Sequence, residues 1–348
     1  MKYFILILLF ISGSGIDLWS QKSPFTKTEI QFNDTLENSY SFFVSGHFYG
    51  GSDNKTGYPV NSILGSSDFI NSSNAKMLIC LGDLFKDVKN DHPYYQKSLF
   101  SSLEVPLFNA VGNHDLTDDY YQKNFGETFY SFKIDDDIHI VLDTELDDGN
   151  ITAGQLQLLT DALEVTRGGG VKNVFIYAHR TIWKDSFEEL DPIFKDNTQS
   201  IGGNNFESDV LPILNELKQE TNVYIFAGSM GGAAPASFFH HENDGITYMA
   251  TAVRGLKRDA ILKIESKDGK LTFETVSLTG QDLLELEEYD LDYWMSNTAD
   301  ESFNWRLLPL YIKTILLHYV FWIGIFTALF LVFSIRLFKK WRAKRKAS

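Results

Sequence analysis

Cysteine and positive charge are both scarce in this chain of 348 residues. The single cysteine, Cys80, excludes an internal disulfide framework and a cysteine-rich zinc module. Lys and Arg number 31 against 46 Asp and Glu, so the formal net charge is −15. Because a nucleic-acid binder needs basic surface, we expect no nucleic-acid partner. Hydrophobic residues at 44% and charged residues at 22% exclude a disordered chain and indicate a globular protein with a sizeable core.

The first twenty residues have the pattern of an export signal. Lys2 precedes the apolar run from Phe4 to Ile11, and the small residues at 12–15 follow it. The run is too short to cross a bilayer, so we expect a signal peptide over residues 1–20. An uncleaved N-terminal anchor is the alternative.

A second apolar run lies near the other end of the chain. Residues 314–335 carry no formal charge and are numerous enough to cross a membrane, and the tail at 336–348 is rich in Lys and Arg. Under the positive-inside rule this tail is cytoplasmic. We therefore expect a single-pass protein of the cell membrane with an extracytoplasmic N-terminal domain. His318 falls inside the predicted span, where we expect a neutral, hydrogen-bonded imidazole near the outer interface.

Between the ends, short apolar runs alternate with helical patterns, which is typical of an α/β fold. After Gly245 the alternation stops, and consecutive strands follow, joined in one place by an Asp268-Gly269 hairpin turn. We expect an irregular segment at 21–39, one domain at 40–277, and an acidic linker with a pre-membrane segment at 278–313. The predicted strands before Gly245 are Ser41–Val44, Lys76–Leu81, Val105–Val111, Ile138–Asp143, Val174–Ala178 and Val223–Ala227, and the predicted helices are Ala153–Val165 and Ser208–Leu217.

Polar side chains follow directly after three of these strands. Asp83 ends one strand, the run from Gly112 to Asp115 ends the next, and His179-Arg180 ends a third. Strand ends are where α/β sheets place their binding sites. Carboxylate, amide and imidazole donors together suit a divalent transition metal such as Mn²⁺, Fe²⁺ or Zn²⁺.

These motifs resemble those of the calcineurin-like metallophosphoesterases over roughly residues 40–277. Gly82-Asp83 is similar to the family's GD motif, the run Gly112-Asn113-His114-Asp115 to its GNHD motif, and His179 to its isolated histidine. The resemblance implies a four-layer αββα sandwich of two mixed sheets with a metal centre at one edge. It also implies a phosphoester substrate or ligand.

The resemblance assigns a role to each motif residue. Asp83 is expected to bridge two metal ions, with His47 on the first ion and Asn113 and His179 on the second. His114 is expected to stabilise or protonate the leaving oxygen. Asp115 would orient His114. Arg180, beside His179, would hold a phosphate oxygen or form an ion pair.

The first and last metal motifs depart from the family pattern. Serine stands at position 45 in place of a carboxylate, and Ser229 and Gly231 replace two histidines. Because two closely spaced dications with few ligands repel each other strongly, we expect one ion, or at most two. His240, His241 and Asp53 are candidate replacement ligands, although solvated loop positions are favoured for all three.

Two functions follow from this incomplete motif set. The first is a membrane-anchored phosphoric ester hydrolase with an incomplete, single-metal centre, in which His114 and Asp115 carry the catalysis. The second is an inactive binding module of the same fold that holds a phosphorylated ligand or a protein partner. The intact GNHD motif favours the hydrolase, and the missing ligands favour the binding module. The sequence names no protein partner.

Overall fold

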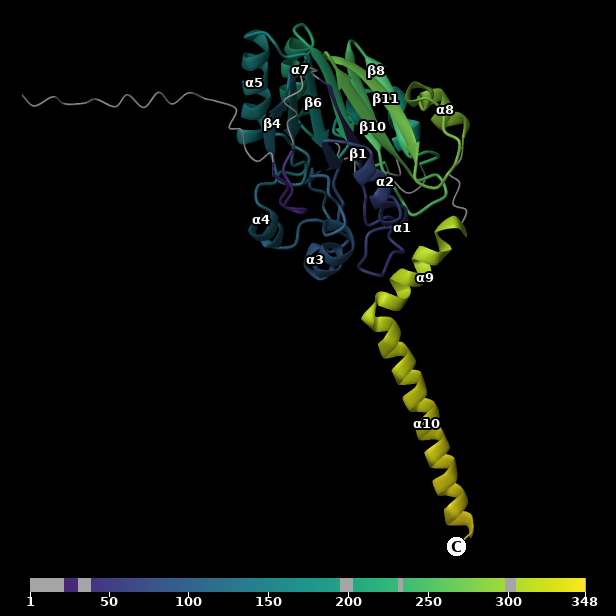
Figure 1. Ribbon diagram of the computed structural model, residues 1–348. Coiled ribbons are helices and arrows are strands. Elements are labelled where there is room, and N and C mark those ends of the chain that lie inside the picture. The colour runs from purple at the N-terminus through teal and green to yellow at the C-terminus, as the bar shows by residue number, and fades with distance from the viewer. Residues whose placement is uncertain (1–21, 31–38, 195–202, 231–233, 298–304, 348) are drawn as a thin grey trace, which may run out of the picture.

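The computed structural model describes residues 22–30, 39–194, 203–230, 234–297 and 305–347. The predicted signal peptide at 1–20 lies outside these described residues. Figure 1 shows a domain of packed sheets and helices from which one long helix, α10, extends. Two sheets form the centre of the domain, one with five strands and one with six.

The five-stranded sheet contains the first predicted strands. Strands β1, β2 and β3 run parallel, with β3 at one edge of the sheet, and β10 pairs with β1 in the antiparallel direction. The β10–β11 hairpin turns at Asp268 and Gly269, which both have positive φ, so the predicted turn is confirmed. In sheet order the strands are β11 (Lys270–Ser277), β10 (Ala260–Lys267), β1 (Ser39–Ser45), β2 (Met77–Cys80) and β3 (Leu107–Asn109).

The six-stranded sheet has a parallel centre formed by β5, β6, β7 and β9. The edge strand β4 pairs with β5 and the edge strand β8 pairs with β9, both in the antiparallel direction, and neither edge strand was predicted. The predicted run of consecutive strands after Gly245 divides between the sheets, because β9 joins this one and β10 and β11 join the other. In sheet order the strands are β4 (Tyr130–Ile134), β5 (Asp137–Val141), β6 (Asn173–Ala178), β7 (Asn222–Ala227), β9 (Ile246–Thr251) and β8 (Phe238–Asn243).

Three apolar layers hold the domain together. Phe42 and Val44 of β1 pack between the sheets against Phe175 of β6, whereas Phe43 points to the other face of its sheet. This alternation follows from the two-residue period of a strand. Helices cover the outer face of each sheet, so the predicted four-layer sandwich of two mixed sheets is confirmed.

The helices divide between the two outer layers. Helices on the five-stranded sheet come from residues before 126, and those on the six-stranded sheet come from later in the chain (Figure 1). The first group is α1 (Asn61–Leu64), α2 (Ser67–Ser72), α3 (Val88–Tyr95) and α4 (Tyr120–Phe125), and the second is α5 (Gly154–Arg167), α6 (Asp191–Phe194) and α7 (Leu211–Leu217). Short π-helical turns extend α3 at Gln96–Phe100 and precede α7 at Phe206–Val210.

The segment predicted as an acidic linker packs on the domain. Helix α8 (Leu291–Ser296) buries Trp294, whose indole N–H donates to the Phe238 carbonyl at 2.9 Å. Leu286 and Tyr289 are buried beside it. The negative charge of this segment suggested solvated chain, but its buried apolar residues pack against the edge strand β8.

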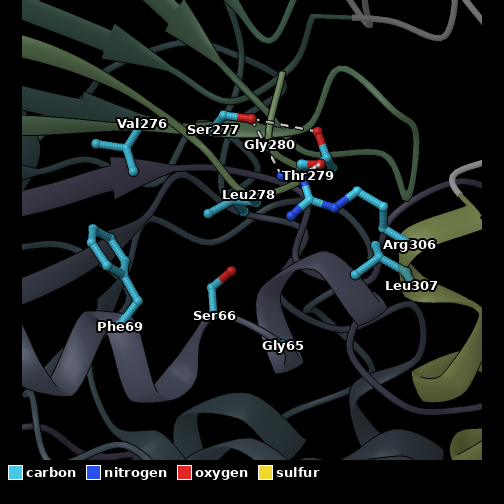
Figure 2. Close-up of a pocket in the computed structure, with 10 residues that line it drawn as sticks. All are labelled: Gly65, Ser66, Phe69, Val276, Ser277, Leu278, Thr279, Gly280, Arg306 and Leu307. Atoms are coloured by element: carbon cyan, nitrogen blue, oxygen red, sulfur yellow. Dashed lines mark hydrogen bonds between the residues drawn. The ribbon is translucent and has the colours of Figure 1, made fainter. Parts of the chain in front are cut away.

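The pre-membrane segment also docks on the domain. The Arg306 side chain donates to the Thr279 carbonyl at 2.7 Å, beside a cavity between α1, α2 and the end of β11 (Figure 2). Helix α9 (Leu308–Leu317) then lies against α1, where the Thr314 hydroxyl donates to the Asn61 side chain at 2.8 Å. Since Thr314 is buried against the domain, the predicted span at 314–335 begins too early.

The membrane-spanning candidate is α10 (Tyr319–Ala347), in which the candidate span covers Tyr319–Arg342 and so includes the first basic residues of the tail. It begins after a break at His318, whose backbone leaves the helical region with ψ of 125°. The His318 ring stacks on Tyr94 of α3 at 5.3 Å. His318 therefore lies at the junction between α9 and α10 and contacts the domain.

Candidate metal centre

The loops that follow β1, β2 and β6 meet at one edge of the paired sheets. The His47 N–H donates to the Gly82 carbonyl at 2.9 Å, which joins the first two loops. The Gly228 N–H donates to the His179 carbonyl at 2.9 Å, which joins the loops after β6 and β7. Because parallel strands end at the same side of a sheet, side chains that are far apart in the sequence meet here.

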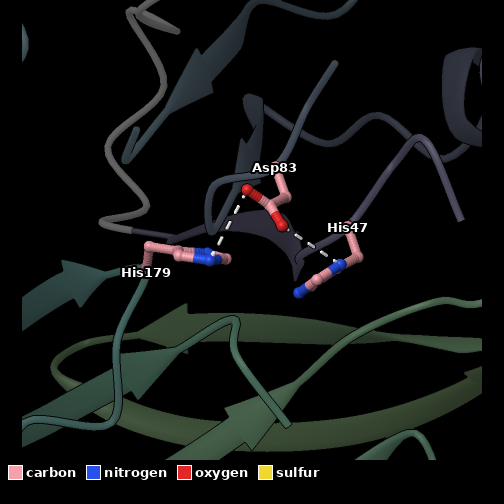
Figure 3. A group of neighbouring side chains, drawn as sticks. All are labelled: His47, Asp83 and His179. Carbon is pink, nitrogen blue, oxygen red and sulfur yellow. Dashed lines mark ion pairs between the residues drawn. The ribbon is translucent and has the colours of Figure 1, made fainter. Parts of the chain in front are cut away.

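Three of the four predicted metal ligands form one buried cluster, consisting of His47, Asp83 and His179 (Figure 3). His47 Nδ1 lies 3.4 Å from Asp83 Oδ2, and His179 Nε2 lies 3.6 Å from Asp83 Oδ1. One donor atom from each residue lies within 4.8 Å of the other two. The carboxylate therefore stands between two imidazoles, with one of its oxygens near each ring.

The hydrogen bonds of the two histidines leave nitrogens available to a ligand. His179 Nδ1 donates to the Leu81 carbonyl at 2.8 Å, so its Nε2 carries the lone pair that faces Asp83. Such a bond to a backbone carbonyl is typical of metal-binding histidines. Both ring nitrogens of His47 are buried without a hydrogen-bond partner. A buried polar atom without a partner is costly, and a bound cation would satisfy it.

Electrostatics and backbone conformation also favour a ligand in this cluster. Burial, the Arg254 charge and the neighbouring histidines hold the pKa of His47 well below its usual range, so the ring is neutral as a metal ligand must be. His47 and Asp83 have φ of 57° and 52°, a left-handed conformation that is uncommon for residues other than glycine. Such conformations concentrate at functional sites.

The cluster fits one divalent ion. Two imidazoles and a carboxylate are a donor set that Zn²⁺, Mn²⁺ and Fe²⁺ accept, with water completing the coordination. A second ion would need further donors. Ser45 occupies the expected carboxylate position with its hydroxyl buried and unpartnered, and Ser229 is also buried. Gly231 lies outside the described residues.

The GNHD loop lies directly on the cluster. An added Cβ at Gly112 would lie 2.4 Å from Asp83 Oδ1, so this position leaves room only for glycine. The His114 N–H donates to Asp83 Oδ1 at 3.2 Å. Asn113, the fourth predicted ligand, is half-buried between these two residues. Its backbone is therefore placed at the cluster.

His114 is held by a group that was not predicted. Its Nδ1 donates to the Lys86 carbonyl at 2.8 Å, and its ring lies 5.1 Å from that of Tyr49. The Nε2 atom of His114 is thus the nitrogen that remains to hold or give a proton. Asp115 was expected to orient this ring, but its hydrogen bonds lead elsewhere.

The buried Asp115 carboxylate connects the loops beneath the cluster. It accepts hydrogen bonds from the backbone N–H groups of Phe85 and Gly112, both at 2.9 Å, and from the Asn109 side chain at 3.1 Å. Burial and the nearby Asp83 charge raise its pKa to about 6, against the pull of these hydrogen bonds. Asp115 therefore fixes the position of the GD and GNHD loops.

Arg180 forms an ion pair, which was one of its two expected roles. Its Nε donates to Glu145 Oε1 at 2.5 Å, and its Nη2 contacts the other carboxylate oxygen. Arg180 is 7% exposed, so this forked pair is shielded from solvent. The Nη1 atom of Arg180 is buried and has no hydrogen-bond partner, so the ion pair leaves one guanidinium nitrogen unused.

The candidate replacement ligands lie outside the cluster. His240 and His241 were expected at solvated loop positions, but they lie on the edge strand β8, which pairs with β9. The His241 ring packs against Phe187 at 4.8 Å, and its Nε2 lies 3.9 Å from Glu189. Asp53 is exposed and lines a cavity together with Arg254.

Tyr49 and Arg254 lie beside the cluster and were not predicted. The Tyr49 ring stands between His47, at 5.5 Å, and His114. Burial, together with the Asp83 charge, raises the pKa of Tyr49 to about 12. Arg254 follows β9, and its charge acts on both His47 and Asp83. Tyr49 comes two residues after the predicted ligand His47, whereas Arg254 belongs to no recognisable motif.

Comparison with known proteins gives structural neighbours only. No protein-family model matches the chain, and no curated protein matches its sequence. "GAP50 the anchor in the inner membrane complex of Plasmodium" is 12% identical, with a TM-score of 0.49 over 76% of this chain and 96% of its own. A putative 5'-nucleotidase from Staphylococcus aureus is 12% identical, with a TM-score of 0.38 over 74% of this chain and 58% of its own.

Proposed function

We propose that this chain is a membrane-attached phosphoric ester hydrolase of the calcineurin-like type with one divalent metal ion. The observation that carries the proposal is the buried cluster of His47, Asp83 and His179, in which both nitrogens of His47 lack a hydrogen-bond partner. In the proposed topology α10 crosses the cell membrane, the domain is extracytoplasmic and the basic tail is cytoplasmic.

The residues of the cluster would hold the ion, and the neighbouring residues would handle protons. A bound divalent ion lowers the pKa of a water molecule and neutralises phosphate charge. His114, fixed through Nδ1 to the Lys86 carbonyl, presents Nε2 as the proton donor to a leaving oxygen. Tyr49 packs against His47 and His114 and limits the access of water to the site.

The second candidate is a binding module without catalysis. The serines at positions 45 and 229 favour it, because both are buried where the family has metal ligands. With three clustered ligands in place of a full two-metal set, such a module would hold one ion and a phosphorylated ligand without turnover.

Metal content and hydrolysis separate the two candidates. We expect the full chain, purified in detergent, to bind about one equivalent of Zn²⁺ or Mn²⁺, and Asp83→Asn to lose this binding. The chain should hydrolyse para-nitrophenyl phosphate when loaded, and His114→Ala should lower the rate by roughly 100-fold with the metal retained.

His241→Gln is the matched control, since His241 lies on β8 among other contacts. Metal binding without hydrolysis would support the binding module. Absence of metal binding in the wild-type chain would refute both candidates.

A further inference from the structure

A cavity of about 390 Å³ lies beside the cluster, between the loop after β1 and helix α9. Tyr49, whose ring contacts His47, and Arg254 line it, as do Tyr311 and Ile315 of α9. Tyr49 therefore separates this cavity from His47. None of the predicted metal ligands lines it.

Arg254 is the feature of this cavity that calls for a ligand. Its Nε atom is buried and has no hydrogen-bond partner. Among the described residues its guanidinium forms no ion pair, because the carboxylate of Asp259 accepts from the backbone N–H of Arg254 instead. Asp83 and Asp259 act on its charge from nearby without pairing with the guanidinium, and an anion in the cavity would give the buried Nε atom a partner.

Other groups of the cavity wall are consistent with an anionic ligand. Lys55 lines the cavity from an exposed position. Lys86 donates its side chain to the Asn54 carbonyl at 2.6 Å, which holds this loop in place. Asp53 supplies the one carboxylate among the lining residues, so Arg254 and Lys55 leave the wall with a net positive charge. Guanidinium groups favour phosphate through paired N–H donors.

Helix α9 places the cavity next to the membrane-spanning candidate. The Tyr311 hydroxyl donates to the Gly255 carbonyl at 3.1 Å, which fixes the helix against the loop after β9. Ile312 and Leu316 on the same helix are 48% and 45% exposed, as expected for side chains that face lipid. Because residues of α9 line the cavity and α10 begins at Tyr319, the cavity lies near the start of the candidate span. Figure 1 shows α10 leaving the domain at the end of α9.

We propose that this cavity binds a phosphate group through Arg254 and Lys55, with α9 as one of its walls. The phosphate belongs to a lipid headgroup or is a free anion, and the chemistry of recognition is the same for both. The binding requires no metal ion, so it is separate from the proposed hydrolysis.

Isothermal titration of the full chain in maltoside micelles tests the proposal, after removal of metal with EDTA. The probes are inorganic phosphate and dihexanoyl phosphatidic acid, a soluble phospholipid. We expect saturable binding near one equivalent, and at least a tenfold loss of affinity in Arg254→Gln. Affinity at least tenfold higher for the phospholipid would identify a headgroup, and similar affinities would identify free phosphate.

Arg167→Gln is the matched control, because Arg167 pairs with Glu216 on the far helix layer and should not affect binding. Lys55→Gln, an exposed substitution, gives a second test with an expected loss of at least twofold. Absence of saturable binding of either probe would overturn the proposal. Unchanged affinity in Arg254→Gln would also overturn it. If Arg254→Gln does not fold, unchanged affinity in Lys55→Gln would overturn it instead.

Metal stoichiometry measured on Lys55→Gln, an exposed substitution away from the metal cluster, keeps the two proposals distinct. We expect it to equal that of the wild-type chain. If the wild-type chain binds phosphate but no metal, the proposed hydrolase is refuted and the proposed phosphate cavity stands. If it binds metal but no phosphate, the phosphate cavity is refuted and the hydrolase stands.

Discussion

Gly228→Ala tests how the metal cluster is built without changing any proposed ligand. Gly228 follows β7 at the position where the family motif begins. A Cβ added there would lie 1.9 Å from the Leu81 carbonyl oxygen and 2.8 Å from the Leu81 Cβ. The same Leu81 oxygen accepts the hydrogen bond from His179 Nδ1. The added methyl group therefore displaces the carbonyl that orients a proposed metal ligand.

The size of the effect follows from this overlap. Non-bonded carbon contacts lie at about 3.5–4.0 Å, so Leu81 or the loop after β7 must move by roughly 1.5 Å. Overpacking of this kind costs about 1–3 kcal/mol of folding free energy. Loss of a hydrogen bond that orients a ligand typically lowers metal affinity by about 10–100-fold. We expect both effects in Gly228→Ala.

The assay is competition of the full chain with a chromophoric zinc chelator, alongside thermal unfolding of the metal-free form. Gly168→Ala is the matched control: Gly168 ends α5 with φ of −68°, and its added Cβ would approach nothing closer than 3.1 Å. We expect the control to match the wild type in both measurements. Wild-type zinc affinity in Gly228→Ala, at an unchanged unfolding midpoint, would refute this account of how the loops hold His179.

Three further predictions concern stability. Burial lowers the pKa of His139 to about 3, so the folded protein keeps this ring neutral while the unfolded chain takes up a proton below about pH 6.5. Its contribution to stability is present above that pH and is lost as pH falls. The free energy of unfolding in urea, plotted against pH, should therefore have a slope lower by about 1.4 kcal/mol per pH unit in His139→Gln than in the wild type between pH 6 and 4. An unchanged slope would contradict this. Asp115→Asn should lower stability by about 1–3 kcal/mol, because an amide donor then faces the N–H donors of Phe85 and Gly112; an unchanged midpoint of thermal unfolding would count against this role. Thr314→Val should speed hydrogen exchange in α9, since it removes a buried hydrogen bond, and unaltered exchange would show that this bond does not hold the helix.

Much of the fold follows from apolar patterning. The central strands β5, β6 and β7 are fully or largely buried and appear in the sequence as nearly continuous apolar runs, which made them predictable. The edge strand β8 reads Phe-Phe-His-His-Glu-Asn and carries little apolar signal beyond its first two residues. Its place in the sheet depends on pairing with β9, a long-range contact that no local pattern contains.

The candidate site was predictable where it follows motif residues at strand ends. His47, Asp83 and His179 were expected together, and the structure brings them together. Tyr49 and Arg254 were not expected, because the role of each depends on which loops meet in space. The docking of residues 286–297 and 305–317 on the domain was missed for a similar reason. Acidic composition describes the exposed side chains of that segment and not the few apolar ones that are buried.

X-ray absorption spectroscopy of the full chain loaded with one equivalent of Zn²⁺ tests the central claim most directly. The claim is that His47, Asp83 and His179 hold a single divalent ion. It predicts a first shell of nitrogen and oxygen at about 2.0–2.2 Å with the outer-shell scattering of two imidazoles, lost in Asp83→Asn. A zinc spectrum without imidazole scattering, or one that Asp83→Asn leaves unchanged, would contradict it.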